Sequence, residues 1–272
     1  MAHAVGIIPA RYASTRFPGK PLASLGGRPL IQHVCERAAR ARRIERIVVA
    51  TDDERIRSAV AAFGGEAVMT SPDHGSGTDR VAEAVEHLER RGIPVEIVVN
   101  IQGDEPMLDA EALDRLVAAL EEDPALGYAT LAEPFADRAE ILDPNTCKVV
   151  ADAAGHALYF SRSPVPFFRL VGGRGIQPLD RALEGRREPL EGYWRHVGIY
   201  AFRREALAEF ARLPAGRLEG MEGLEQLRIL EAGRRIRIVV SDRMTMDVDT
   251  PEDLRTVQSL LGRERLAQGE RG

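Results

Sequence analysis

Short apolar runs alternate with amphipathic segments along the first hundred residues, and this alternation limits the possible folds more than any other feature. The apolar runs are short enough for buried strands, and the segments between them carry apolar residues at helical spacing. Strands and helices that alternate in this way form right-handed crossovers and a mainly parallel sheet. We therefore predict a Rossmann-like α/β fold. It consists of a mainly parallel mixed sheet with helices on both faces, whose ligands bind beyond the carboxyl ends of the strands.

The expected elements follow from this periodicity and from the turn residues between them. In the segment 29–43, for example, Ile31, Val34, Cys35 and Ala38 share one helical face. The predicted strands are 5–9, 46–51, 66–70, 95–102, 127–133, 146–151, 157–162, 193–203 and 235–241. The predicted helices are 29–43, 53–63, 78–91, 109–122, 218–232 and a terminal helix that begins at Pro251.

Composition and charge limit the class of partner. A net charge of -5 disfavours a nucleic acid partner. No apolar run approaches the roughly 20 residues that span a bilayer, and the N-terminus lacks the pattern of a signal peptide. We therefore expect a cytoplasmic protein with no membrane partner. Cys35 and Cys147 lie outside any CxxC spacing, so reduced thiols are expected rather than a disulfide or a zinc site.

The length of 272 residues suits one large domain, which we assign to residues 1–262. A small inserted β and loop excursion is expected at about 145–195, because its second half is rich in Pro, Gly and Arg without a regular period. Within it, Val165, Phe167 and Phe168 form either a subunit contact or lid, which is slightly favoured, or a locally packed loop. Residues 263–272 are expected to form a frayed tail.

A basic loop follows the first predicted strand and contains Arg11, Arg16 and Lys20 within ten residues. Three positive charges beside the backbone freed by Gly19 suit a polyanion, most simply a triphosphate. Neither familiar phosphate-binding pattern fits, because Pro21 replaces the Ser or Thr of GxxxxGK[ST] and GxGxxG is absent. The alternative is a solvated surface loop. The rarity of lysine argues against it, since this chain uses arginine at nearly every other basic position.

A second polar loop, TSPDHGSGTDR, precedes the predicted helix 78–91. Either Ser76 or Thr78 can cap this helix, and capping alone is one interpretation of the loop. The loop carries more polar groups than a cap requires, so contact with a base edge is the other interpretation. Arg80, one turn into the helix, is suited to holding a carboxylate in a bidentate manner.

Acidic residues follow the most apolar predicted strand. Asp104 lies directly after Gly103, which allows close approach of the backbone, and Asp104 is suited to holding Mg²⁺ together with substrate phosphates. Asp249 precedes the terminal helix, where it either caps that helix or supplies the second carboxylate of a metal pair with Asp104. His196, near the start of a predicted strand, is a lone histidine of the kind that is more often structural than catalytic.

Seven motifs, taken in order, carry a specific resemblance. They are IIPARYASTRFPGKPL, HGSGTDR, NIQGDEP, ALYFSRSPVPF, RHVGIYAF, LEQLR and VDTPEDL, and they cover about residues 5–260. In this order and spacing the chain resembles the 3-deoxy-manno-octulosonate (Kdo) cytidylyltransferases. It departs at residues 168–190, which look longer and more basic than the family pattern, and beyond Gly262. Neither departure touches a motif.

The resemblance implies a nucleotidyltransferase domain that transfers CMP from CTP to the anomeric hydroxyl of Kdo and releases pyrophosphate. It implies a Mg²⁺ cofactor, a homodimer and a place in lipopolysaccharide biosynthesis. By the same resemblance, the catalytic residues are Arg16, Lys20 and Asp104, and the metal ligands are Asp104 and Asp249. The implied nucleotide-binding residues are Ala10, Arg11, Arg16, Lys20, Ser76 and Gly77. The implied sugar-acid-binding residues are Arg80, Gln102, His196, Glu222 and Gln226.

Three alternatives stand beside this interpretation. The first is the same transfer to a related sugar acid, 8-amino-Kdo or a sialic acid. The second is a catalytically silent nucleotide-binding sensor, against which the presence of both candidate metal carboxylates argues. The third is a glycosyltransferase that uses a DxD triplet. Residues 247–249 match that triplet in letters, but they precede the final helix instead of directly following a strand.

Overall fold

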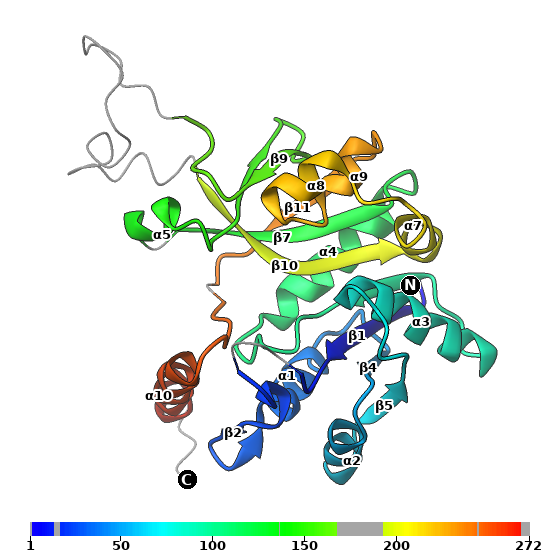
Figure 1. The fold of residues 1–272 in the computed structure, drawn as a ribbon, viewed down its shortest axis with the longest axis vertical. Helices are drawn as coiled ribbons and strands as arrows, with labels where there is room; N and C mark the ends of the chain where they lie inside the picture. Colours follow the sequence, from blue (N-terminus) through cyan, green and yellow to red (C-terminus); the bar gives the residue numbers. More distant parts are fainter. Residues whose placement is uncertain (1, 14–16, 136, 168–192, 244, 268–272) are drawn as a thin grey trace.

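The computed structural model describes residues 2–13, 17–135, 137–167, 193–243 and 245–267. Within these ranges the strands form one nine-stranded sheet and a separate two-stranded ribbon (Figure 1). The main path of the sheet runs β11-β7-β10-β6-β1-β4-β5. Its strands are β1 (Ala4–Ala10), β4 (Arg46–Thr51), β5 (Glu66–Met69), β6 (Ile97–Asn100), β7 (Tyr128–Pro134), β8 (Lys148–Ala151), β9 (Ala157–Ser161), β10 (Trp194–Arg203) and β11 (Ile236–Val240). The ribbon is β2 (Ser24–Leu25) with β3 (Arg28–Pro29).

Most strand pairs in the sheet are parallel. β1 pairs in parallel with β4 and β6, β4 with β5, and β11 with β7. β10 is the exception, since it lies antiparallel between β6 and β7. The predicted mainly parallel mixed sheet is therefore confirmed. Because β6 and β1 are central and parallel, the loops that leave their carboxyl ends meet at one edge of the sheet.

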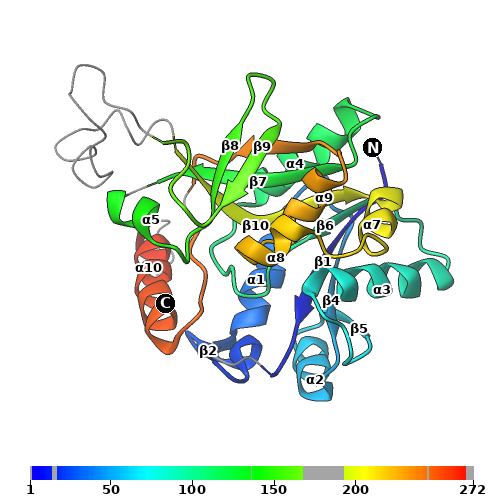
Figure 2. The same ribbon diagram turned by 45° about the horizontal axis from the view of Figure 1, so that its top comes forward.

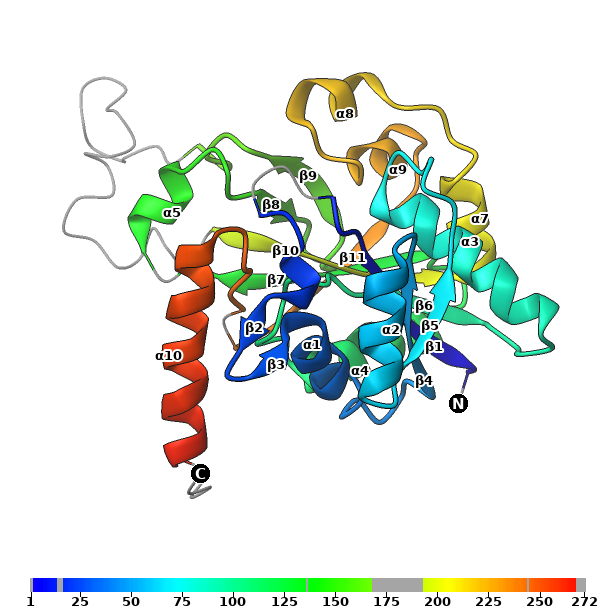
Figure 3. The same ribbon diagram turned by 60° about the horizontal axis from the view of Figure 1, so that its bottom comes forward.

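Helices cover both faces of the sheet, as predicted. The helices are α1 (Leu30–Ala38), α2 (Glu54–Ala62), α3 (Gly77–Arg90), α4 (Ala110–Glu122), α5 (Arg138–Leu142), α7 (Arg204–Phe210), α8 (Arg217–Glu222), α9 (Leu227–Glu231) and α10 (Pro251–Ala267), with a 3₁₀ turn η1 (Lys20–Leu22). Apolar residues of α1, α2 and α4 pack on one face, and those of α3, α7 and α9 pack on the other. Figure 3 shows α1, α2 and α4 together on one side of the strands.

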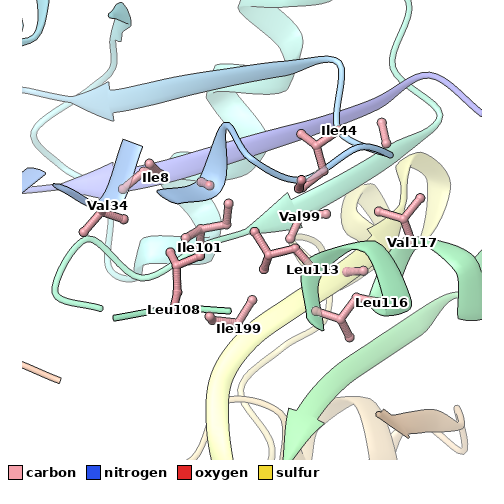
Figure 4. Close-up of a cluster of buried hydrophobic side chains, with 14 of the residues drawn as sticks. Ile8, Val34, Ile44, Val99, Ile101, Leu108, Leu113, Leu116, Val117 and Ile199 are labelled. Carbon is pink, nitrogen blue, oxygen red and sulfur yellow. The ribbon is translucent and has the colours of Figure 1, made fainter. Parts of the chain in front are cut away.

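The alternation of side chains along a strand explains why β1 must be apolar throughout. Ile8 belongs to the core cluster beneath α1 and α4, whereas its neighbour Ile7 belongs to the cluster beneath α3. Val99 and Val98 divide between the two clusters in the same way along β6. Figure 4 shows the cluster that contains Ile8 and Val99. A strand buried on both faces needs apolar residues at every position, and the sequence of β1 has this continuous apolar pattern.

Two predicted helices differ from the observed ones. The helix predicted at 218–232 is wrong, because Gly223 adopts a left-handed conformation (φ 64°) and separates α8 from α9. The helix predicted at 29–43 ends early, at Ala38, because the following turns direct Ala41 and Ile44 into the core. Two short helices, α5 and α7, and the β2–β3 ribbon carry too few residues to show a period, and sequence reasoning missed them.

The terminal helix begins as predicted but extends further. Thr250 caps α10, because its Oγ1 accepts a hydrogen bond from the backbone N–H of Asp253 (3.2 Å) and Pro251 occupies the first helical position. Val257 of this helix packs with Leu25 and Val248 in a third apolar cluster. The helix continues to Ala267, so residues 263–267 are helical instead of frayed, and residues 268–272 lie outside the described residues.

The predicted hairpin of the excursion is confirmed. β8 and β9 pair antiparallel, and β8 also pairs with the start of β10, so the hairpin extends the main sheet. Figure 2 shows this hairpin projecting beside β7. Residues 168–192, which include Phe168 and the whole of the longer, basic segment 168–190, lie outside the described residues.

Candidate active site

The basic loop is folded back at Gly19. Gly19 adopts φ +72°, a conformation that glycine accepts without strain, and its N–H donates to the carbonyl of Tyr12 at 2.8 Å. A Cβ at Gly19 would lie 3.1 Å from the Tyr12 ring. The turn directs Lys20, the first residue of η1, toward the carboxyl edge of the sheet. Arg16, predicted to be catalytic and nucleotide-binding, lies outside the described residues.

Lys20 joins the two acidic segments of the sequence. Its Nζ lies 2.6 Å from Oδ2 of Asp104 and 3.1 Å from Oδ1 of Asp249. Asp104 and Asp249 are 145 residues apart in the chain, and both carboxylates are about one-quarter exposed. The structure thus brings together one predicted phosphate-binding residue and both predicted metal ligands. Since Thr250 provides the cap of α10, the alternative role of Asp249 as a cap is excluded.

The backbone holds the same three segments together. A Cβ at Gly103 would lie 3.1 Å from the carbonyl oxygen of Pro9, which is too close for most side chains, so glycine lets the loop after β6 pass beside β1. The backbone N–H of Val248 donates to the carbonyl of Asp104 at 2.9 Å. These contacts place Asp104 between the first strand and the segment that leads into α10.

Charge at this site favours a cation. Burial opposes the charge of the Lys20 ammonium, but the charges and hydrogen bonds of Asp104 and Asp249 outweigh burial and raise the pKa of Lys20. Burial, together with the charges of Asp104 and Asp247, raises the pKa of the neighbouring Glu105 to about 8. Among the described residues, no set of three or more carboxylate, histidine or cysteine ligands could enclose a metal ion. Asp104 and Asp249 fit a Mg²⁺ ion that takes its other ligands from phosphates and water, because they already share one cation.

Arg11 ties the basic loop to the second polar loop. Its guanidinium donates to the carbonyl oxygens of His74 (2.6 Å) and Ser76 (3.1 Å). Ser76 caps α3, because its Oγ accepts from the N–H of Asp79 while the Asp79 carboxylate accepts from the N–H of Ser76. The capping interpretation of the Ser76 side chain is confirmed. Gly77 is the first residue of α3, and a Cβ placed on it would lie 3.4 Å from Cγ of Pro9, so this helix starts beside the end of β1.

Ala10, the last residue of β1, lies at the same edge and is buried. Its side chain therefore presents little surface to a ligand. Only the backbone of this residue is available for the predicted contact with the nucleotide.

Arg80 lies one turn into α3, as predicted, and is buried inside the protein. Its side chain is fully buried and donates to Oγ1 of Thr70 (2.6 Å) and to Oδ2 of Asp52 (2.9 Å). Thr70 and Asp52 directly follow β5 and β4, so Arg80 joins the carboxyl ends of these two strands. Arg80 therefore already holds a carboxylate of the protein itself, and its predicted contact with the sugar acid stays a prediction.

The other predicted sugar-binding residues lie around β10 and the hairpin. Gln102 donates to the carbonyl of Gly198 at 2.7 Å, and Glu222 accepts from Ser161 Oγ at 2.7 Å and from the N–H of Arg162 at 2.9 Å. Gln226 is buried against Cys147. His196 contacts Thr130 Oγ1 at 2.9 Å and the edge of the Phe160 ring. Burial and the charge of Arg195 lower the pKa of His196 to about 3, so it is neutral near pH 7.

Sequence reasoning missed the buried charges behind the site. Glu133 on β7 pairs with Arg195 on β10 at 2.6 Å, and Glu225 accepts from Thr78 Oγ1 at 2.6 Å. Burial raises the pKa values of both Glu133 and Glu225. A signal for the first pair was present, since Arg195 lies within a buried strand and such a charge needs a partner.

The arrangement defines a class of protein. A basic loop after the first strand of a parallel sheet, together with two carboxylates that share a cation beyond its central strand, is the layout of an α/β nucleotidyltransferase. The chain belongs to the cytidylyltransferase family, whose model matches residues 5–236.

Individual relatives are similar over nearly their whole length. The 3-deoxy-manno-octulosonate cytidylyltransferase of Syntrophobacter fumaroxidans is 50% identical over 260 residues, covering 96% of this chain and 97% of that protein. The 8-amino-3,8-dideoxy-manno-octulosonate cytidylyltransferase of Shewanella sediminis is 44% identical, covering 94% and 97%. A solved structure of CMP:2-keto-3-deoxy-manno-octonic acid synthetase complexed with CTP superposes with a TM-score of 0.84 at 42% identity, covering 97% of this chain and 100% of that one. No helix in the described part of the chain is long and apolar enough to cross a membrane.

Proposed function

We propose that this enzyme transfers CMP from CTP to the anomeric hydroxyl of Kdo and releases pyrophosphate. The observation that carries the proposal is the shared contact of Lys20 with Asp104 and Asp249 at the carboxyl edge of the sheet. A relative named for this activity is 50% identical to the chain, and the similar solved structure contains CTP. This activity places the enzyme in lipopolysaccharide biosynthesis.

In this proposal each segment has a separate task. Lys20, with Arg16 of the same loop, binds the triphosphate and stabilises the negative charge that develops on pyrophosphate as it leaves. Arg11 holds the Ser76–Gly77 segment at the end of β1, where the backbone near Ala10 contacts the nucleoside. Gln102, His196, Glu222 and Gln226 contribute to the sugar-acid pocket.

Asp104 and Asp249 would hold Mg²⁺, with the substrates supplying further oxygen ligands. When bound, the ion supplies neutralising charge for an in-line displacement at the α-phosphate. The protein's part is to bring two carboxylates from distant segments together, and before the nucleotide binds Lys20 keeps them together through hydrogen bonds to both.

The two candidate sugar-acid substrates are Kdo and its 8-amino analogue. Greater identity to relatives named for Kdo favours Kdo, since 50% identity to one of them exceeds the 44% shared with a relative named for the 8-amino sugar. A single exchange of a hydroxyl for an amine at C8 changes charge and hydrogen bonding, so a site can discriminate strongly between the two acids.

Pyrophosphate release tests the proposal directly. The assay crosses the four nucleoside triphosphates against Kdo, 8-amino-Kdo and sialic acid, with Mg²⁺ present. We expect release with CTP and Kdo. Release with CTP and another acid would retain the mechanism and change the substrate. Absence of release in every combination would contradict the proposed enzyme and favour a nucleotide sensor, which equilibrium binding of CTP would then reveal.

We also propose a cytoplasmic homodimer. Leu158 on β9 is 61% exposed and Phe167 is 59% exposed, and both belong to the excursion that projects from the sheet. Large apolar side chains at such exposure favour a protein contact. The predicted lid remains the alternative for this segment.

A further inference from the structure

A buried ion pair lies behind the segment that carries Asp249. Arg195 and Glu133 are directly paired in the register of β10 and β7, and Nε of Arg195 lies 2.6 Å from Oε1 of Glu133. The Glu133 side chain is fully buried, and that of Arg195 is 18% exposed. A buried ion pair adds little to stability, because the loss of hydration offsets much of the attraction. Its presence here suggests a task other than stabilising the sheet.

Both partners reach beyond the sheet to Thr245. Arg195 donates to the carbonyl oxygen of Thr245 at 3.0 Å and to its Oγ1 at 2.9 Å. Oε2 of Glu133 accepts from the backbone N–H of Thr245 at 2.9 Å. The ion pair therefore forms hydrogen bonds with the backbone N–H, the carbonyl oxygen and the hydroxyl group of Thr245. Thr245 becomes an anchor for the chain that leaves β11.

The anchored segment is short and is held again before Asp249. The N–H of Val248 donates to the carbonyl of Asp104, and the Val248 side chain is buried with Leu25 and Val257. Between Thr245 and Asp249 the chain therefore has little freedom. Asp247 adds a weaker contact, with Oδ1 at 3.8 Å from the Arg195 guanidinium.

We propose that Arg195 and Glu133 are positioning residues that fix the Asp249 carboxylate opposite Asp104, an inference that rests on the proposed metal site. Metal ligands work only when a second set of contacts orients them, and removal of such contacts weakens metal binding by about 10- to 100-fold. Asp104 lies four residues after the end of β6, and its backbone is held close to β1 by Gly103 and to Val248 by a hydrogen bond. Asp249 lies in the segment between β11 and α10, and the ion pair supplies a fixed point for that segment at Thr245.

The effect of Mg²⁺ on the affinity for CTP tests this positioning in the absence of turnover. Calorimetry gives the dissociation constant of CTP once with EDTA and once with saturating Mg²⁺, in both cases without sugar acid. The ratio of the two constants reports how much the carboxylate pair contributes through the metal. A loss of fold or of the CTP site would change the EDTA value, whereas a positioning defect changes the ratio.

Two variants and a matched control make the test specific. Glu133→Gln keeps the shape of the side chain, but only one of its two terminal atoms can still accept a hydrogen bond, and its NH₂ group then faces an N–H donor. Arg195→Met removes the guanidinium group. Arg203→Met is the control, because Arg203 at the other end of β10 also donates to backbone carbonyls, those of Leu126 (3.0 Å) and Asp123 (3.3 Å). We expect the Mg²⁺-dependent ratio to fall about 10- to 100-fold in the first two variants and to remain unchanged in the control. The dissociation constants of CTP measured with EDTA should stay within about twofold of the wild-type value.

The possible failures are distinguishable. If Arg195→Met does not fold, the milder Glu133→Gln carries the test. An unchanged ratio in the folded variants would overturn the positioning role alone, as would an equal loss of affinity with EDTA and with Mg²⁺. If Asp249→Asn also keeps the wild-type ratio, the metal assignment itself is wrong, and the positioning role is overturned with it.

Discussion

In the proposed metal site, Lys20 would compete with Mg²⁺ for the same pair of carboxylates. In this arrangement its ammonium contacts both Asp104 and Asp249, so a divalent ion and the lysine cannot occupy one position. Transfer of Lys20 to the phosphates of CTP would free the carboxylates at the moment when the substrate brings its own ligands for the ion. This exchange would make metal binding depend on the nucleotide.

Removal of the Lys20 charge should therefore have opposite effects on binding and on turnover. In Lys20→Met the carboxylates lose their shared cation, and we expect the nucleotide-free enzyme to bind Mn²⁺ about fivefold more tightly, the equivalent of about 1 kcal/mol for a partly exposed ion pair. Turnover should fall by about 10²- to 10³-fold through loss of charge at the leaving group. Electron paramagnetic resonance of free Mn²⁺ and steady-state kinetics measure the two effects. Weaker Mn²⁺ binding in this variant would contradict the competition.

His196 makes stability depend on acid pH. Its pKa in the folded protein is about 3, below the value of about 6.5 in an unfolded chain, so the unfolded state binds a proton first as the pH falls. The stabilisation is complete above about pH 6.5 and is lost progressively toward pH 3. In His196→Gln, we expect unfolding free energy to decline less between pH 7.5 and 5.0 than in wild type, by about 1 to 2 kcal/mol. Urea titrations at the two pH values test this, and parallel losses in both proteins would contradict it.

At the scale of single elements, the break between α8 and α9 depends on one glycine. Gly223 has φ +64°, and a side chain there is strained even though the nearest atom to its Cβ, Nε of Arg162, is 4.0 Å away. We expect Gly223→Ala to lower the unfolding free energy by about 1 kcal/mol. Gly220→Ala is the matched control, because Gly220 lies within α8 in open space and should gain about 0.5–1 kcal/mol. Chemical denaturation compares them, and equal effects would refute the conformational explanation.

How far the sequence predicts an element depends on the range of the interactions that form it. Periodicity identifies β1, β4 and β6 because their burial on both faces is encoded in adjacent residues. It cannot show that Arg80 meets Asp52, because that contact depends on the packing of α3 against two strand ends. The pairing of Arg195 with Glu133 likewise depends on the insertion of β10 beside β7, an order that no local pattern contains.

The two acidic segments illustrate the same limit at the site. The sequence places Asp104 at a strand end and leaves two roles for Asp249. The sequence also predicts Thr250 as a cap, which is confirmed, but only the folded chain shows that both carboxylates meet Lys20. The resemblance of the seven motifs supplied roles that local physics could not provide, and for Arg80 it could not show the buried pairing with Asp52.

At the scale of the whole molecule, the excursion is the part of the sheet that suits contact with a second copy. It carries exposed Leu158 and Phe167, whereas the opposite edge ends in β5, where Met69 is 38% exposed. A charge placed at a buried interface is costly because it loses hydration without a partner. A charge on a free surface has little effect.

We therefore expect Leu158→Asp to convert a dimer into a monomer with retained fold. Met69→Asp, at the far edge of the sheet, is the matched control and should leave the mass unchanged. Light scattering during gel filtration, over a range of protein concentrations, measures the mass, and circular dichroism checks the fold. Because the excursion includes the hairpin that binds Glu222 through Ser161, loss of the dimer should also raise the KM for Kdo more than the KM for CTP. A monomeric wild type, or a Leu158→Asp variant that remains dimeric, would remove the excursion from the subunit interface and leave the lid as its role.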